Sequence, residues 1–488
     1  MVKFDAKKYS TTVKLIFLKA AYLIFPKAEV LIDNSLNNGI YGEIHHLGRE
    51  LTQQDIDHIN LKMKEIIEKN YSVKLVCENN EHLKLKTSTI NRPDITKLLD
   101  NSGWTGMMEY EIDGYSDFVY DRPYAFTGDV DVYELTKYNN GFILKFPRTP
   151  DKKLPPTIDT PKVAKVFADA GEWNRILGVE TIGDLNEKVV RKQIDELIKV
   201  NEALHHKEIA KIAHQISENK NIKLVTIAGP SSSGKTTFSK RLYIHLRANG
   251  VKPIVISLDN YYIGRDRVPL DEHGNKDFET IEALDLDLLN KNLTDLIAGK
   301  EVDIPVYNFI TGEREEKFRR MKVASGNGLI IIEGIHGLNE RLTKDISRDH
   351  KFKIYISCLT QLNIDRHNRI STSDVREIRR LVRDSLSRDE EGEGTLAMWD
   401  SVRRGEEKHI FPFQEDADAL FNSNLVYELG VLKSYALREL IKIKPSSPYY
   451  NEAKRIMRFL YCFVDIDANL VPGDSLLKEF IGNSVFYD

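Results

Sequence analysis

Hydrophobic and polar positions follow two different periods along this chain, and the period predicts which segments are helices and which are strands. Near the N-terminus, Thr52 and Asp55 have the spacing of a helix-capping pair, and apolar residues follow at helical intervals. This pattern predicts a helix with one buried face. Short apolar runs at 73–76 and 142–146 predict strands, the second after an Asn-Asn-Gly turn. We therefore expect an α+β region here.

The pattern changes after a stretch rich in proline, between residues 147 and 161. Helical periodicity then continues to about residue 220, and its three histidines are expected to be solvated: His205, His206 and His214. Beyond this point, short apolar runs rich in β-branched residues alternate with helical segments. The runs are 224–228, 254–258, 329–332 and 353–356. This alternation predicts a doubly wound α/β sheet of buried parallel strands, with ligands at their carboxyl ends.

These changes predict four segments, which are an α+β domain at 1–150, a linker with connecting helices at 151–220, a doubly wound α/β domain at 221–430 and a helical tail at 431–488. A formal net charge of −4 argues against a general nucleic-acid coat protein. Three cysteines without C-x-x-C spacing argue against a disulfide scaffold and fit a reducing compartment. The apolar run at 15–25 is too short to cross a bilayer. We therefore expect a cytoplasmic protein.

One stretch carries a complete phosphate-binding motif. Residues 224–241 read LVTIAGPSSSGKTTFSKR, so a predicted strand passes through a glycine-rich loop into a predicted helix, as the G-x-x-x-x-G-K-[ST] pattern requires. Backbone N–H groups of such a loop face a phosphate, and the helix adds its positive dipole end. The residues expected to bind a nucleoside triphosphate are Gly229, Ser231, Ser232, Ser233, Gly234, Lys235, Thr236 and Thr237. Among them, Lys235 can reach the β- and γ-phosphates, and the Thr236 hydroxyl can ligate Mg²⁺.

Two acidic residues and a group of arginines add to this motif. Asp259 follows the run at 254–258, and Glu333 follows the run at 329–332. An acid at a strand end beside such a loop can hold Mg²⁺, whereas a helix N-cap or a solvated acid is the alternative. Four arginines share one side of a predicted helix: Arg376, Arg379, Arg380 and Arg383. They can neutralise a transferring phosphoryl group, and a solvated basic face or an RNA patch is the alternative.

Six segments resemble the uridine/cytidine kinase and phosphoribulokinase branch of the P-loop kinases. In chain order they are GPSSSGKTT, SLDNYY, DFETIEALD, PVYNF…GER, IIIEGIHGL and DVREIRRLVRDSLSR. The resemblance covers about 221–430 and implies a kinase that uses ATP and Mg²⁺. It implies that Asp259 is the general base, that Lys235, Arg379 and Arg383 are also catalytic, and that Thr236 and Glu333 hold Mg²⁺. The acceptor residues that it implies are Tyr262, Phe278, Glu279, Tyr307, Phe309, Arg376 and Arg379.

The acceptor pocket departs from the pattern of the uridine/cytidine kinases. Asn308 replaces an acid of that family, and Gly312 stands where the family has a histidine that reads the pyrimidine. A glycine offers no side-chain hydrogen bond. The first expectation is phosphorylation of a nucleoside 5′-hydroxyl, with uridine or cytidine as acceptor. A kinase for another small hydroxylated acceptor, or an RNA-associated regulator switched by ATP, are the alternatives.

The N-terminal part resembles the second N-terminal (editing) domain of threonyl-tRNA synthetases. The segments that carry this resemblance are LKAAYLIFPKAEV, NNGIYGEI, LTQQDIDHINLKMKEII and DRPYAFTGDVDVYELTKYNNGFILKFP. The H-x-x-x-H pair of that domain falls on Thr11 and Leu15 here, and neither side chain can act as a base or a metal ligand. The resemblance therefore implies a scaffold, regulatory or RNA-contacting module. Together with the kinase segments and the tail DSLLKEFIGNSVF, it makes nearly the whole chain resemble a bacterial-type group of uridine kinase-like nucleoside kinases. No membrane partner is expected, and the sequence leaves homo-oligomer formation open.

Overall fold

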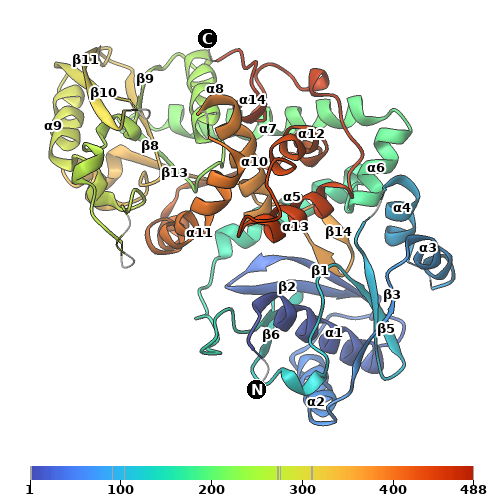
Figure 1. The fold of residues 1–488 in the computed structure, drawn as a ribbon. Helices are drawn as coiled ribbons and strands as arrows, with labels where there is room; N and C mark the ends of the chain where they lie inside the picture. Colours follow the sequence, from blue (N-terminus) through green and yellow to red (C-terminus); the bar gives the residue numbers. More distant parts are fainter. Residues whose placement is uncertain are drawn as a thin grey trace. The chain divides into compact units, whose positions relative to one another are not determined.

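The computed structural model describes residues 3–90, 92–103, 105–271, 274, 276–308, 311–388 and 390–486. Contacts between residues divide the chain into two compact units (Figure 1). Unit 1 comprises Met1–Ile194, Thr360–Ser371 and Arg455–Val464. Unit 2 comprises Asp195–Leu359, Thr372–Lys454 and Asp465–Asp488. The four segments expected from the sequence stay a prediction, because contacts alone do not test where one functional domain ends.

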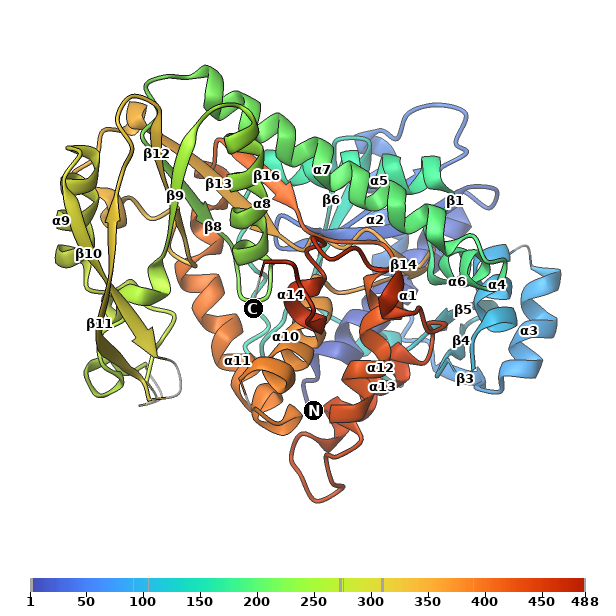
Figure 2. The same cartoon turned by 90° about the horizontal axis from the view of Figure 1, so that it is seen from above.

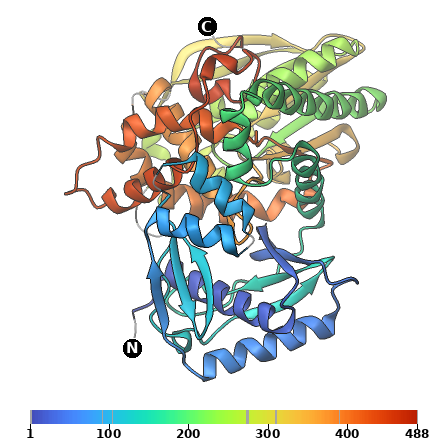
Figure 3. The ribbon, with the colours of Figure 1, turned by 90° about the vertical axis from the view of Figure 1, so that its right-hand side faces the viewer.

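Unit 1 is an α+β unit with two antiparallel sheets (Figure 3). The first sheet has the order β1-β2-β7-β6, with bounds Glu29–Leu36, Gly39–His45, Gly141–Lys145 and Glu134–Tyr138. The second has the order β3-β4-β5, with bounds Val73–Cys77, Met108–Ile112 and Tyr115–Val119. A small hairpin adds β14 (Asn363–Asp365) and β15 (Asn368–Arg369). The helices are α1 (Ala6–Ile24), α2 (Gln53–Glu68), α3 (Asn80–Thr89), α4 (Pro93–Asn101), α5 (Pro161–Leu177) and α6 (Ile182–Val190).

Local sequence explains how these elements begin and which side they bury. The capping pair at the start of α2 is confirmed, because the Thr52 hydroxyl accepts the Asp55 N–H (3.3 Å) and the Asp55 carboxylate accepts the Thr52 N–H (2.9 Å). Burial alternates residue by residue along β1, as expected for a sheet with one face on the core. Thr11 and Leu15 are both buried in α1, where the Thr11 hydroxyl donates to the Lys7 carbonyl (3.0 Å).

Unit 2 contains a five-stranded parallel sheet with the order β16-β13-β8-β12-β9, seen from above in Figure 2. The strand bounds in that order are Ala419–Asn422, Lys351–Ser357, Leu224–Ala228, Gly328–Glu333 and Lys252–Ser257. The predicted apolar runs are therefore confirmed as parallel strands. Burial is nearly complete along β8, β12 and β13 but only partial along the edge strand β9. The run at 254–258 differs at its end, because Leu258–Tyr261 forms a 3-10 turn in which the Ser257 hydroxyl accepts the Asp259 N–H (3.4 Å). Asp259 consequently lies in this turn, two residues beyond β9.

The other elements of unit 2 surround this sheet. A two-stranded antiparallel ribbon is formed by β10 (Glu301–Asn308) and β11 (Glu313–Lys322). The helices are α7 (Ile194–Glu218), α8 (Lys235–Ala248), α9 (Leu286–Ile297), α10 (Thr372–Ser387), α11 (Gly392–His409), α12 (Glu428–Leu440) and α14 (Lys478–Ile481), while α13 spans Tyr450–Leu460. Across the part of the chain that the structure describes, no helix is long and apolar enough to cross a membrane.

One expectation for α7 is wrong. His205 is buried, its ring lies 5.0 Å from that of Phe421 on β16, and its Nε2 lies 3.2 Å from the Asn424 carbonyl. Burial lowers the pKa of His205 to about 3, so the imidazole is neutral. The helical pattern alone did not identify this face of α7, because the strand that covers His205 comes about two hundred residues later in the chain.

Candidate functional site

The phosphate-binding motif occupies the turn between β8 and α8. Gly229 passes so close to β13 that an added Cβ would lie 2.1 Å from the Ile356 carbonyl oxygen. Gly234 has φ +87°, a left-handed conformation that favours glycine, immediately before α8 begins at Lys235. Ser232 also has a positive φ, of 58°. The two glycines therefore allow the loop to turn sharply and present the first N–H groups of α8 at the carboxyl edge of the sheet.

Three charged side chains interact at this edge. Glu333 ends β12, which pairs with both β8 and β9, so Lys235, Glu333 and Asp259 come from three neighbouring strands and their following turns. The Lys235 ammonium donates to the Pro230 carbonyl (3.0 Å). Burial lowers the pKa of Lys235, and the charges of Glu333 and Asp259 act in the opposite direction. The predicted catalytic and metal-binding groups are thus electrostatically coupled.

Both acids of this group hold their protons more tightly than usual. Burial and the charge of Asp259 raise the pKa of Glu333, and Lys235 lowers it, so that the pKa lies at about 7. Burial also raises the pKa of Asp259, against the lowering effect of Lys235, Arg388 and Arg383. A bound cation would stabilise both carboxylates in their charged forms. Oxygen donors of this kind, together with the Thr236 hydroxyl, are the ligands that Mg²⁺ prefers.

The arginines of α10 divide into two groups. Arg376 Nε donates to the Ser231 carbonyl (3.0 Å), and its guanidinium pairs with Glu406. Arg379 donates to the Ser232 carbonyl (3.3 Å) and pairs with Glu428. Both guanidinium groups are buried and hold the carbonyl side of the loop. The carboxylates of Glu406 and Glu428 therefore balance the charges of these two arginines.

Arg380, Arg383 and Arg388 form the second group. Arg380 donates to the Ser231 hydroxyl (3.0 Å), and Arg383 donates to Asp384 (2.8 Å). Arg383 and Arg388 lower the pKa of Asp259, so their charges act directly on the expected base. Asp384 forms ion pairs with all three of these arginines, so their charges are also neutralised in part. Arg383 and Arg388 differ from the two buried arginines because their charges act on Asp259, which suits them to stabilise charge on a transferring group.

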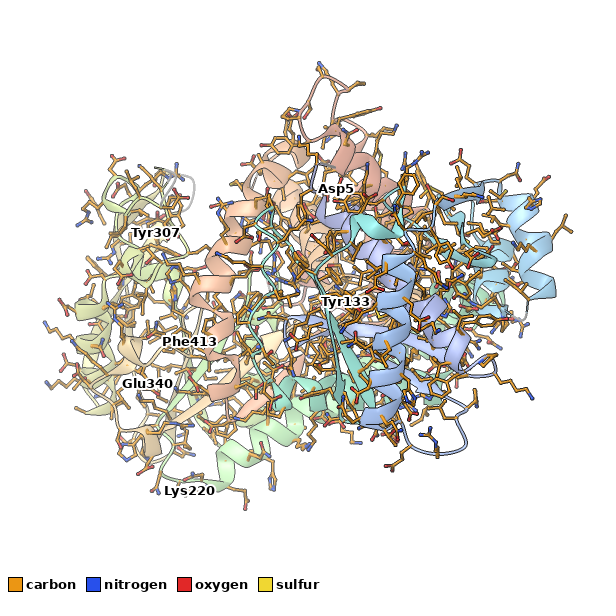
Figure 4. All side chains as sticks on the ribbon, turned by 90° about the horizontal axis from the view of Figure 1, so that it is seen from below. Asp5, Tyr133, Lys220, Tyr307, Glu340 and Phe413 are labelled. Atoms are coloured by element: carbon orange, nitrogen blue, oxygen red, sulfur yellow. The ribbon has the colours of Figure 1, made fainter. Side chains whose placement is uncertain are left out.

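The residues expected around the acceptor lie next to the turn that holds Asp259. The Tyr262 hydroxyl donates to the Phe278 carbonyl (3.0 Å), and the Tyr262 ring lies 5.6 Å from that of Tyr307 on β10. Tyr307 is labelled in Figure 4. Burial raises the pKa of Glu279 to about 7, with a further contribution from Glu406. The predicted Phe309 lies outside the described residues.

The Gly312 position has little room for a side chain. Gly312 has φ +74°, and an added Cβ would lie 2.7 Å from Arg265 Nε. The Arg265 N–H also donates to the Gly312 carbonyl (2.8 Å). A histidine at this position would require both a strained backbone and a shift of Arg265. Residue 312 therefore contributes its backbone, with Arg265 beside it.

Several residues that contact the site were not found by sequence reasoning. Glu406 accepts the Ser231 N–H (3.0 Å), and Glu479 accepts the Thr237 N–H (3.0 Å). Glu406 belongs to none of the motifs, and Glu479 lies in the tail DSLLKEFIGNSVF, to which the resemblance assigns no role in the site. Arg314 is different, because it lies in the GER segment that was noted. It donates to the Tyr262 carbonyl (3.0 Å) and to Asp285 (3.0 Å), so it fixes the turn that follows Asp259.

Comparison with known proteins agrees with this geometry. Residues 224–427 match the model of the phosphoribulokinase / uridine kinase family. A uridine kinase of Saccharomyces cerevisiae is 30% identical over 239 residues, which cover 46% of this chain and 44% of the yeast protein. A uridine kinase of Limosilactobacillus reuteri is 30% identical over 173 residues, which cover 36% of this chain and 70% of the relative. The match thus spans less than half of the yeast protein's length.

A solved structure described as that of a possible uridine kinase from Bacillus stearothermophilus is also similar. The similarity covers 41% of this chain and 89% of that one, with 19% sequence identity and a TM-score of 0.28. A TM-score of this size supports no conclusion about this chain.

Proposed function

Because this chain belongs to the phosphoribulokinase/uridine kinase family, we propose that it transfers the γ-phosphoryl group of ATP to a hydroxyl, first of all the 5′-hydroxyl of uridine or cytidine. The observation that carries the proposal is the coupling of Lys235, Asp259 and Glu333 beside the phosphate-binding loop. Family membership supports a P-loop kinase that binds ATP. The acceptor and the metal ion are parts of the proposal.

In this mechanism the loop amides and Lys235 hold the phosphates of ATP. The Thr236 hydroxyl and the Glu333 carboxylate would hold Mg²⁺, which supplies positive charge against the β- and γ-phosphates when it is bound. The elevated pKa of Glu333, about 7, fits this role because a cation compensates the charge that burial opposes. Arg383, with Arg388, stabilises negative charge on the group being transferred, and Arg376 and Arg379 support the loop.

Asp259 is proposed to activate the acceptor. Its carboxylate takes the proton of the acceptor hydroxyl while that oxygen forms a bond to the γ-phosphorus and the bond from phosphorus to the β,γ-bridging oxygen breaks. The products are ADP and the phosphorylated acceptor. The raised pKa of Asp259 makes it a better proton acceptor than an exposed aspartate, provided that it is ionised before the reaction begins.

The structure around Gly312 supports a second class of acceptor besides the pyrimidine nucleosides. Arg265 fills the space where a side chain at 312 would lie, so recognition of a pyrimidine by a histidine at that position has no counterpart here. Tyr262, Phe278, Tyr307 and Glu279 are proposed to receive the acceptor in either case. Another sugar-type or small hydroxylated acceptor would use the same Asp259 chemistry.

We propose further that the N-terminal part is a threonyl-tRNA synthetase-like module with a scaffold, regulatory or RNA-contacting role. The residues that support this are Thr11 and Leu15, which are buried in α1 at the positions of the synthetase histidine pair. An ATP-switched, RNA-associated regulator is the corresponding alternative to a kinase. Cytoplasmic localisation and homo-oligomer formation are also proposals.

The test is ATP consumption with Mg²⁺ by the full chain, against uridine, cytidine, other nucleosides, sugar phosphates and a blank without acceptor. Turnover confined to uridine and cytidine supports the first proposal. Turnover with another acceptor keeps the mechanism and changes the substrate. ATP binding without turnover on any acceptor would favour the regulator.

A further inference from the structure

An internal carboxylate lies on the phosphate-binding loop. Thr237 is the third residue of α8, so its N–H belongs to the first donors of that helix, which have no acceptor within the helix itself. A loop of this type uses such donors for the α- and β-phosphates of a nucleotide. Here Glu479 Oε2 accepts the Thr237 N–H at 3.0 Å. A carboxylate oxygen therefore occupies a position that a phosphate oxygen would need.

The segment that carries Glu479 is firmly anchored. Its neighbours Leu476, Leu477 and Phe480 are almost completely buried, and α14 packs against α10. The Phe480 ring lies 5.0 Å from the Arg379 guanidinium. Leu476 also covers Gly234, where an added Cβ would lie 2.5 Å from its Cδ2 atom. This anchoring holds Glu479 at a high effective concentration beside the loop.

The charge of Glu479 is compensated differently from that of Glu406. Glu406 accepts a loop N–H as well, yet it pairs with Arg376 and with Arg403 (3.2 Å). Among the residues that the structure describes, no cation forms an ion pair with Glu479. The charge of Glu479 instead acts on Lys235 and raises the pKa of Glu333. A nucleotide phosphate would therefore meet a negative charge that no direct ion pair neutralises, although Lys235 and Arg379 interact with it at longer range.

We propose that Glu479 competes with the nucleotide for the phosphate-binding loop and thereby sets the affinity of this chain for ATP. The inference rests on the proposed ATP-binding function and adds a regulation of the same site. When ATP binds, the Glu479 side chain rotates away from the Thr237 N–H, while Leu476, Leu477 and Phe480 stay packed. Only the form with Glu479 displaced accepts the phosphates, so the apparent affinity falls with the fraction of that form.

The same contact has a second consequence, for the protein without nucleotide. A carboxylate at the start of α8 interacts favourably with the helix dipole and accepts an N–H that has no acceptor within the helix. Removing the charge therefore lowers the melting temperature of the nucleotide-free chain and increases the rise that ATP produces. These opposite changes distinguish competition from a purely structural role of Glu479. A purely structural role predicts a lower melting temperature both without and with ATP.

The experiment compares the dissociation constant of ATP for the full chain and for Glu479→Gln, measured by titration calorimetry. Glutamine keeps the shape and a hydrogen-bond acceptor but removes the charge. We expect ATP to bind at least about tenfold more tightly to this variant, because two negative charges a few ångströms apart repel by several RT at a partly buried site. Glu208→Gln is the matched control, since Glu208 is half-exposed on α7 beside Lys211.

Each outcome decides the question. Equal or weaker ATP binding by Glu479→Gln would overturn the proposal and leave the proposed kinase intact. Tighter binding without phosphorylation of any acceptor would support the competition and refute the kinase. Failure of both proteins to bind ATP would refute both. Glu479→Asp provides a second check, because its shorter side chain does not reach the Thr237 N–H and should also bind ATP more tightly than the unchanged chain.

Discussion

Glu333→Gln tests whether the fold opposes ionisation of the acid at the end of β12. Burial and the charge of Asp259 raise the pKa of Glu333 from 4.5 to about 7. A folded pKa above the unfolded value means that the carboxyl group contributes stability below pH ~4.5, and that this stability is lost as the pH rises toward ~7. Glutamine resembles the protonated acid, so the variant should gain stability relative to the unchanged chain at high pH.

The magnitude follows from the two pKa values. The difference of about 2.5 corresponds to ~3 kcal/mol once the group is fully ionised in both states. At pH 5, where the group is ionised in most unfolded chains but in few folded ones, the same linkage gives a destabilisation of only about 1 kcal/mol. The advantage of Glu333→Gln in free energy of unfolding should therefore grow by ~2 kcal/mol between pH 5 and pH 8.

The assay is urea unfolding of the full chain at both pH values, with EDTA present so that bound metal does not mask the effect. Comparing one variant with the unchanged chain cancels any contribution of glutamine that does not depend on pH. Glu208→Gln controls for the loss of one negative charge. An equal stability difference at pH 5 and pH 8 would refute the reasoning, because it would mean that Glu333 ionises as easily in the folded chain as in the unfolded one.

Three further predictions concern neighbouring parts of unit 2. Asp259→Asn should reduce acceptor phosphorylation at least ~100-fold, as expected for loss of a general base, with little change in ATP affinity; turnover close to that of the unchanged chain would show that another group takes the proton. Gly312→Ala should lower stability by about 1–2 kcal/mol because of its positive φ and the nearby Arg265. Arg265→Ala removes the contacts with Nε and Cζ and leaves the backbone strain and the Cβ contact at 3.0 Å, so a complete rescue in the double variant would contradict the role of backbone strain. Arg379→Met leaves the buried Glu428 carboxylate without its partner and should cost about 3–5 kcal/mol in a denaturation experiment, whereas adding Glu428→Gln should restore much of that loss.

The presence of parallel strands and the position of the phosphate-binding loop followed from local patterns, whereas the order of the strands in the sheet did not. Apolar runs such as 224–228 predict buried strands, and the spacing from Gly229 to Thr236 specifies a loop that only a strand–turn–helix setting can present. The capping pair at Thr52 was equally readable, because both hydrogen bonds form within three residues. Interactions between residues that are close together in the chain can therefore be predicted from the sequence pattern.

The roles within the arginine cluster were not readable in the same way. The spacing of Arg376, Arg379 and Arg383 places them on one side of α10, but it does not say what faces that side. Glu406 and Glu428, which neutralise the first two, lie on later helices and match no motif. Arg383 acts on Asp259 instead. The predicted catalytic role of Arg379 stays a prediction, and its contacts describe a support for the loop.

By itself, the sequence determined that this chain contains a parallel α/β unit with a phosphate-binding loop and an acid at the end of each of two apolar runs. Short-range periodicity and a contiguous motif are sufficient for that, because each depends on residues close together in the chain. Only the tertiary structure decided that Glu479 reaches the Thr237 N–H, that His205 is buried against β16, and that Arg265 fills the space at Gly312. Each of these contacts joins segments that are far apart in the chain. Short-range patterns do not predict such contacts, because only the packing of the folded chain brings the segments together.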